Sequence, residues 1–305
     1  MNNVDLSVKI GSLVLQNPVM LASGTVGYGN EISDYTDLSK IGGIVTKSVS
    51  LHPRKGNPPK RITETSSGML NAIGLANVGL EAFIKDKIPF LKDIGSTLIC
   101  NIAASSVDEY VECTKTLDSE DTVKAFEINV SCPNVKDGGL IFGNDVNNVR
   151  VITEKVRAVT NKPIIIKLSP NTASIKEFAQ AAKDEGADAV SAINTLIGTA
   201  FDIYSKKPKI KNITGGLSGP AIKPVALAKV LEISRNVDIP IIGIGGIMNW
   251  KDAVEFMICG ASAIQLGTVN FVNPSASEEI IKGLNDYCVE TGLSKISDLT
   301  GSYSL

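Results

Sequence analysis

The sequence predicts an α/β protein built as a (β/α)8 barrel, also called a TIM barrel, and three observations support this fold. Short apolar runs alternate along the chain with segments of helical period, which is typical of a parallel sheet covered by helices. Eight such runs occur, as the barrel requires, and its 305 residues suit one barrel domain, 1–305. The runs are residues 19–22, 43–49, 98–103, 125–130, 164–168, 189–194, 239–244 and 263–266.

The segments around these runs agree with a barrel. Residues 6–10 and 13–15 flank a Gly-Ser pair, which predicts a short N-terminal β-hairpin that caps the bottom of the barrel. Ser106 and Asn249 precede helical segments, and a hydroxyl N-cap at residues 172–174 precedes a third at 175–184.

Three long loops follow the ends of predicted strands, at residues 50–79, 131–144 and 195–223. Active sites of barrels lie at the C-terminal face of the sheet. We therefore expect these loops at the C-terminal face to build or cover the site.

Composition narrows the class of function. The chain has 30 basic and 32 acidic residues and no long basic run, so nucleic acid is not an expected partner. No apolar run reaches the ~18 residues that span a bilayer, and the N-terminus lacks a secretory pattern. We expect a cytoplasmic protein without a membrane partner.

The five cysteines include no Cys-x-x-Cys pair, which argues against zinc, iron–sulfur and disulfide sites in this chain, and no metal is expected.

Glycines at the ends of the last two predicted strands indicate a phosphate site. Gly245 and Gly246 follow one strand, and Gly267 with Thr268 follows the next. Backbone N–H groups without side chains can approach an anion closely, and barrels commonly hold phosphate at this place. Gly219 is a candidate third element of the cradle. The alternative is that these glycines only permit tight turns.

Two lysines follow apolar runs near strand ends, Lys47 and Lys167. A cation beside a bound cofactor stabilises negative charge that develops on it. Either lysine alone is also compatible with a solvated strand terminus, and a Schiff-base lysine of a barrel aldolase is an enzymatic alternative.

Four asparagines lie at or near the same face: Asn71, Asn129, Asn134 and Asn194. Carboxamides offer both donors and acceptors, which suits a substrate with amide-like edges such as a pyrimidine dione. Any one of them alone is explained as a turn residue.

Cys132 is the leading acid/base candidate. Among the five cysteines it alone lies among loop residues at a strand mouth, whereas the others are expected to be inert core residues. The single histidine, His52, precedes Pro53 and gives little support to a histidine-centred triad.

Together these stretches resemble the class 1 dihydroorotate dehydrogenases, which are FMN enzymes of pyrimidine (UMP) biosynthesis with a single-domain (β/α)8 fold. The resemblance covers almost the whole chain. The matching stretches are residues 17–24, 46–48, 71–75, 129–134, 193–195 and 215–220, together with the glycine sites at 243–246 and 267–268.

The resemblance implies oxidation of (S)-dihydroorotate to orotate, with Cys132 and Lys47 as catalytic residues. Cys132 would remove the proton at the pyrimidine 5 position while a hydride passes from the neighbouring carbon to FMN, and Lys167 would favour the reduced, anionic flavin. The implied FMN contacts are Ser23, Lys47, Ser48, Asn101, Asn129, Lys167, Ile193, Gly219, Gly245, Gly246, Gly267 and Thr268. The implied substrate contacts are Lys47, Asn71, Ala72, Ile73, Gly74, Leu75, Asn129, Asn134, Asn194 and Thr195.

Residues 71–75 and 214–219 resemble the NAD-linked B type within class 1. A thiol base fits class 1, because class 2 enzymes carry serine there and an N-terminal extension. The B type implies one FMN in this chain and a partner electron-transfer subunit that carries FAD and a [2Fe-2S] cluster, in a heterotetramer built on a homodimer of this chain. The alternatives are a fumarate-using, homodimeric A-type enzyme, a Schiff-base lysine aldolase, and a non-catalytic barrel subunit.

Overall fold

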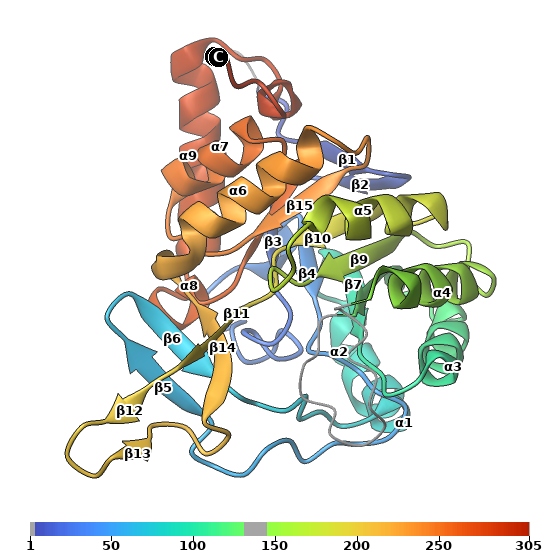
Figure 1. The fold of residues 1–305 in the computed structure, drawn as a ribbon. Coiled ribbons are helices and arrows are strands. Elements are labelled where there is room, and N and C mark those ends of the chain that lie inside the picture. The colour runs from blue at the N-terminus through green and yellow to red at the C-terminus, as the bar shows by residue number, and fades with distance from the viewer. Residues whose placement is uncertain (1–3, 131–144, 305) are drawn as a thin grey trace.

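Eight parallel strands close into a barrel at the centre of the computed structural model, which describes residues 4–130 and 145–304 (Figure 1). Around the barrel the order is β3, β4, β7, β8, β9, β10, β15, β16 and back to β3. The strands are β3 (Val19–Leu21), β4 (Gly43–Val45), β7 (Thr97–Ile102), β8 (Val123–Asn129), β9 (Ile164–Leu168), β10 (Ala189–Ala192), β15 (Ile241–Ile244) and β16 (Ala263–Leu266). Each strand overlaps one of the apolar runs, so the predicted barrel is confirmed.

Helices cover the outside of the barrel, and this explains why its strands are almost completely buried. The helices are α1 (Leu80–Ala82), α2 (Ile88–Lys92), α3 (Val107–Asp118), α4 (Val146–Arg157), α5 (Ile175–Asp184), α6 (Lys223–Ser234), α7 (Trp250–Ile258), α8 (Val269–Val272) and α9 (Ala276–Thr291). Among the described residues, none of these helices combines the length and the apolar character that a membrane crossing demands.

Two of the three predicted N-caps are confirmed. The Ser106 hydroxyl accepts a hydrogen bond from the Glu109 N–H, and Asn249 forms a reciprocal capping box with Asp252. The predicted hydroxyl cap of α5 is wrong in its chemistry, because Ser174 occupies the cap position without a side-chain hydrogen bond to the helix. Ser174 has the extended backbone conformation that N-cap residues usually adopt.

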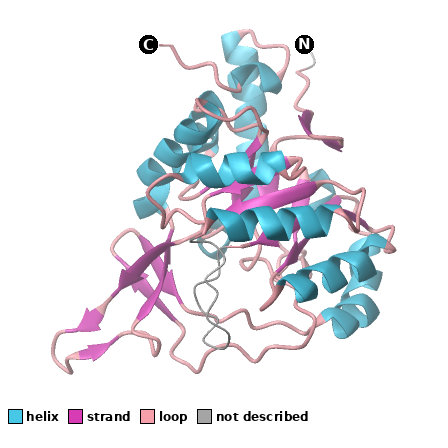
Figure 2. Cartoon of the chain, turned by 45° about the vertical axis from the view of Figure 1, so that its right-hand side comes forward, coloured by secondary structure: helices cyan, strands magenta, loops and turns pink. Residues whose placement is uncertain are grey.

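The predicted N-terminal hairpin is present as β1 (Val8–Ile10) and β2 (Leu13–Leu15). Ile10 and Leu15 are fully buried, and a Cβ atom at Gly11 would contact Asp188, which directly precedes β10. The hairpin therefore lies at the N-terminal ends of the barrel strands. Both ends of the chain lie on this side of the molecule in Figure 2, and Asp5 forms backbone hydrogen bonds with Ser294 and Ile296.

Two of the predicted long loops contain strands that the sequence did not indicate. β5 (Ile62–Thr65), β6 (Gly68–Asn71), β11 (Leu196–Thr199) and β14 (Thr214–Ser218) form an antiparallel sheet in the order β11, β14, β6, β5. The sheet stands beside the barrel, away from the hairpin, and the ribbon of β12 (Phe201–Asp202) and β13 (Lys207–Pro208) projects from it (Figures 1 and 2). The third predicted loop, 131–144, lies outside the described residues.

Candidate active site

The polar residues predicted at the barrel mouth come from adjacent strands. Asn129 on β8 pairs in register with Lys167 on β9, and Lys167 pairs with Ser191 on β10. Because side chains at paired positions point to the same face of a sheet, the amide and the ammonium that the sequence singled out lie side by side. The Lys167 side chain is almost completely buried.

A buried carboxylate lies next to these groups, and the sequence analysis missed it. The side chain of Glu127 on β8 is fully enclosed in the barrel. Its Oε1 atom accepts from Asn101 Nδ2 at 2.7 Å and lies 3.4 Å from Lys167 Nζ. The available signal was one charged residue inside an otherwise apolar strand run, residues 125–128.

Ser48 and Asn101 extend this network toward the end of β4. The Ser48 hydroxyl donates to Asn101 Oδ1 at 2.5 Å, and both side chains are buried. Lys47 precedes Ser48 and is only partly buried. Burial lowers the pKa of the Lys47 ammonium; the nearby Glu31 carboxylate opposes this change, and Arg61 adds to it.

The structure brings three of the predicted amides into one chain of contacts. Asn194 Nδ2 donates to Asn129 Oδ1 at 3.3 Å, and the Thr195 N–H donates to Asn194 Oδ1 at 2.8 Å. Thr195 packs against Gly216 of β14, where a Cβ atom would collide with its hydroxyl, and Asn71 Nδ2 donates to the Gly216 carbonyl at 3.3 Å. The small sheet therefore places Asn71 beside the barrel residues.

Residues 72–75 follow β6, and main-chain hydrogen bonds hold this segment in place. The Ala72 N–H donates to the Arg61 carbonyl at 2.7 Å, and the Ile73 carbonyl accepts from Asn57 N–H at 3.0 Å. Gly74 and Leu75 have φ angles of 73° and 57°, in the region that favours glycine. This backbone is placed by the small sheet and its neighbours rather than by the barrel.

The predicted phosphate residues also converge. A Cβ atom at Gly246 would lie 2.8 Å from the Gly219 carbonyl, and one at Gly219 would lie 3.5 Å from the Thr268 methyl group. The Thr268 hydroxyl is hydrogen-bonded to Ser218 at 2.8 Å. Three connections far apart in sequence thus form one glycine-rich surface.

Two further predicted residues lie at strand ends near this surface. Ile193 is buried, and its N–H donates to the Ile244 carbonyl, directly before Gly245, at 3.0 Å. Ser23 follows Ala22, whose N–H donates to the Leu266 carbonyl, directly before Gly267, at 2.9 Å. Both are therefore beside the glycine turns.

Cys132 and Asn134 lie outside the described residues, so their roles stay predictions. Of the other cysteines, Cys100, Cys113 and Cys288 are buried as expected, and burial raises the pKa of Cys100 and Cys113 to about 12. Cys259 is only partly buried, so its expected core position is corrected. In the ranges 4–130 and 145–304, no group of three His, Cys, Asp or Glu side chains is arranged to hold a metal ion.

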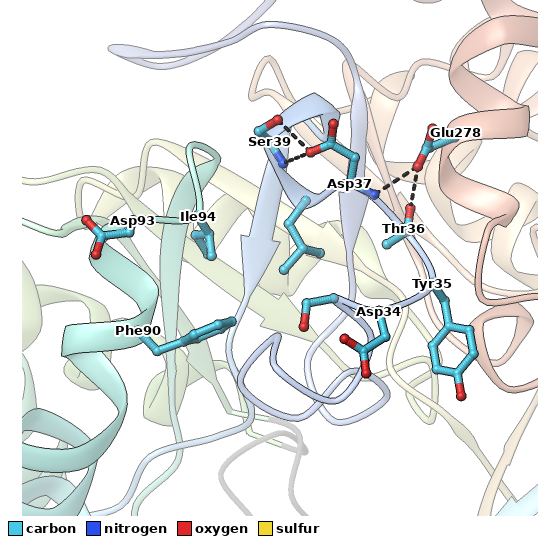
Figure 3. Close-up of a pocket in the computed structure, with 11 residues that line it drawn as sticks. Asp34, Tyr35, Thr36, Asp37, Ser39, Phe90, Asp93, Ile94 and Glu278 are labelled. Carbon is cyan, nitrogen blue, oxygen red and sulfur yellow. Dashed lines mark hydrogen bonds between the residues drawn. The ribbon is translucent and has the colours of Figure 1, made fainter.

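A surface hollow of about 690 Å³ lies elsewhere, between residues 33–39, α2 and α9 (Figure 3). None of the predicted site residues lines it. Some of its polar groups are hydrogen-bonded to one another: Glu278 accepts from Asp37 N–H at 2.9 Å and from the Thr36 hydroxyl at 3.2 Å. The Asp37 N–H is the main cause of the lowered pKa of Glu278. These contacts tie α9 to the segment before β4.

Comparison with known proteins agrees with the motif resemblance. The family model described as Dihydroorotate dehydrogenase matches residues 5–288. The chain is 54% identical over 297 residues to the protein of Trichlorobacter lovleyi named dihydroorotate dehydrogenase B (NAD(+)), catalytic subunit, covering 97% of this chain and 98% of the relative. Proteins with the same name from Geotalea daltonii and Bacteroides fragilis are 52% and 49% identical, over 99% and 98% of both chains. The chain therefore belongs to the dihydroorotate dehydrogenase family.

Proposed function

We propose that this protein is the FMN-containing catalytic subunit of an NAD-linked dihydroorotate dehydrogenase that oxidises (S)-dihydroorotate to orotate. The observation that carries the proposal is the convergence at one barrel mouth of a buried lysine, an amide cluster and a glycine-rich surface. Relatives with about half of their residues identical bear the B-type name, which supports the NAD-linked form over the fumarate-using one.

The glycine-rich surface fits the phosphate of FMN. A Cβ atom at Gly246 would approach both the Gly219 carbonyl and the backbone nitrogen of Lys223, so the absence of a side chain keeps this backbone open. The Thr268 and Ser218 hydroxyls supply further polar atoms. Helix α6 begins at Lys223, and the helix dipole favours negative charge near this N-terminal end. Gly219, Gly245, Gly246, Gly267 and Thr268 would hold the phosphate end.

The groups on the barrel strands fit the flavin ring, which supplies a hydride acceptor when FMN is bound. Lys167 offers a cation that favours negative charge on the reduced ring. Ser23, Lys47, Ser48, Asn101, Asn129 and Ile193 would complete the contacts. The hydrogen bond from Ser48 to Asn101 gives these two side chains a fixed relative orientation.

The amide cluster fits a pyrimidine dione, because its members present both donors and acceptors. Asn129, Asn194 and Thr195 would bind one edge of the substrate, with Asn134. Lys47 and residues 71–75 would bind the rest. In the reaction Cys132 would take the proton from the pyrimidine 5 position, and the neighbouring carbon would give up a hydride to the oxidised flavin that bound FMN supplies. The electron pair of the broken C–H bond at position 5 would form the C=C bond.

The B type requires a route for electrons to NAD. We propose a partner subunit that carries FAD and a [2Fe-2S] cluster, in a heterotetramer built on a homodimer of this chain. The names of the relatives, which are catalytic subunits, support such a partner.

An acceptor assay tests the function. The purified chain should be yellow with bound FMN and should oxidise dihydroorotate with an artificial acceptor, but use NAD poorly until the partner is added. Efficient fumarate reduction by the chain alone would favour the A type. A colourless protein that refuses FMN would contradict the flavin proposal and favour a lysine aldolase.

The Cys132→Ala variant tests the base. We expect turnover to fall by roughly 10²- to 10⁴-fold, as is usual for the loss of a general base, while FMN stays bound. The matched control is Cys259→Ala at the partly exposed C-cap of α7, which should keep parental turnover. Near-parental turnover in Cys132→Ala would remove this thiol from the mechanism.

A further inference from the structure

The carboxylate of Glu127 joins four strands inside the barrel. Its Oε1 atom faces Asn101 Nδ2 of β7 at 2.7 Å and Lys167 Nζ of β9 at 3.4 Å. Its Oε2 atom accepts from Ser191 Oγ of β10 at 2.9 Å and from Gln265 Nε2 of β16 at 2.7 Å. Four donors therefore occupy the acceptor positions of one carboxylate.

This arrangement determines how two groups at the barrel mouth are presented. Because Asn101 gives its Nδ2 to Glu127, its Oδ1 is left to accept from Ser48. The orientation of the Asn101 amide, and with it the Ser48 hydroxyl, follows from the carboxylate. The Lys167 ammonium lies 3.4 Å from the same oxygen, so the carboxylate attracts the cation toward its own position in the barrel.

Glu127 itself cannot meet a substrate, because its side chain is fully enclosed. Most side-chain hydrogen bonds in proteins go to the backbone or to water rather than to other side chains. Here the donors are four side chains from four strands, and two of them belong to the set that faces the cofactor. The network is therefore suited to position those two groups.

We propose that Glu127 is a positioning residue that holds Lys167 and Asn101 in the orientation in which they act on the bound flavin. This inference rests on the proposed function, since it assigns Lys167 to the flavin. Glu127 differs from the residues proposed to contact FMN, because its carboxylate is enclosed in the barrel and acts through Lys167 and Asn101.

The test is the two-electron midpoint potential of FMN in the parent, Glu127→Gln, Lys167→Met and the double variant, each as FMN-loaded protein. In the parent background, Lys167→Met should lower the equilibrium constant for reduction at least tenfold, which is about 30 mV. In the Glu127→Gln background, Lys167→Met should lower the same equilibrium constant by less than about fivefold, because Lys167 is no longer held in place. An effect of Lys167→Met as large in Glu127→Gln as in the parent overturns the proposal.

Glu127→Asp provides a second variant if Glu127→Gln does not fold. It keeps the charge but withdraws the carboxylate by one methylene from Lys167 and Asn101. We expect a change in the FMN midpoint potential and in the visible flavin spectrum. A parental potential and spectrum in folded Glu127→Asp contradict a positioning role.

Thr114→Val is the matched control, because Thr114 is buried on α3 and donates to the Tyr110 carbonyl at 2.8 Å outside this network. It should lower the melting temperature and leave the flavin potential unchanged. A shift in Thr114→Val as large as that in the Glu127 variants would show a nonspecific effect and overturn the proposal. If the parent protein still binds FMN and oxidises dihydroorotate, the proposed function stands even when the positioning proposal fails. A parent protein that does not bind FMN would overturn both the proposed function and the positioning proposal.

Discussion

The two lysines at the barrel mouth have different surroundings. Lys167 lies beside the Glu127 carboxylate inside the barrel, whereas Lys47 is partly buried at the end of β4. Burial lowers the pKa of Lys47 and is the largest effect; the Glu31 carboxylate opposes it, and the Arg61 guanidinium adds to it. The Lys47 ammonium therefore gives up its proton at a lower pH than an exposed lysine does.

This pKa predicts the pH dependence of orotate binding. A lowered pKa means that the positive charge is present below that pKa and is lost as pH rises through it. Orotate is an anion, so its affinity should fall with rising pH at values below 10.5, the ordinary pKa of lysine. Titration of the flavin spectrum with orotate at several pH values measures this.

Lys47→Arg is the control for the orotate titration, because arginine keeps its charge throughout that range. Its affinity for orotate should be nearly independent of pH over the same interval. An identical decline in the parent and in Lys47→Arg would assign the titration to another group.

At the scale of elements, the glycine-rich surface depends on connections that meet only in the folded barrel. Gly246 follows β15, Gly219 precedes α6 and Thr268 follows β16. Gly246 has a φ of 72°, and a Cβ atom there would lie within 3 Å of Gly219 and Lys223. Both the backbone conformation and the close approach therefore require glycine.

Gly246→Ala should weaken FMN binding by at least tenfold, because Gly219 or Lys223 must shift to admit the methyl group. Equilibrium titration of the apoprotein with FMN measures this loss. Gly292→Ala is the matched control, since Gly292 has a φ of 74° and open space around its Cβ position. It should cost about 1 kcal/mol of stability from the strained backbone, without weakening FMN binding. Equal FMN affinity in both variants would argue against the cradle.

At the scale of the whole molecule, the hairpin and the small sheet lie at different ends of the barrel (Figure 1). The hairpin covers the N-terminal ends of the strands, away from the site, and packs Ile10 and Leu15 into the main core. The small sheet supplies Asn71 and Gly216 to the site. One end therefore contributes to the main core, and the other to the candidate site.

Leu15→Ala should lower the free energy of unfolding by about 2 to 5 kcal/mol, as buried leucines do when truncated. Val14→Ala, on the opposite face of the same strand, should change it by less than about 1 kcal/mol because Val14 is 57% exposed. Denaturant unfolding measures both. Dihydroorotate oxidation at temperatures where both variants are folded should be unaffected, and a large loss in Leu15→Ala would contradict this division of roles.

Many features of the fold could be predicted from local patterns. Parallel strands covered on both faces contain continuous apolar runs, and Ile164, Ile165 and Ile166 at the start of β9 are an example. The small sheet was missed because its strands are short, half-exposed and rich in glycine, as in Thr214–Ser218. Its glycines are needed for close packing against Asn71 and Thr195, which no local pattern reveals.

The order of the barrel elements, the lysines, amides and glycines at the strand ends, and the family resemblance could all be predicted from the chain's own residues. Which of these groups meet depends on how the barrel closes. β16 closes the barrel on β3, which lies more than two hundred residues earlier, and the side chains that point inward depend on that closure and its register. For this reason the sequence shows Glu127 only as one charged residue in an apolar run, whereas the folded barrel surrounds its carboxylate with hydrogen-bond donors from four strands.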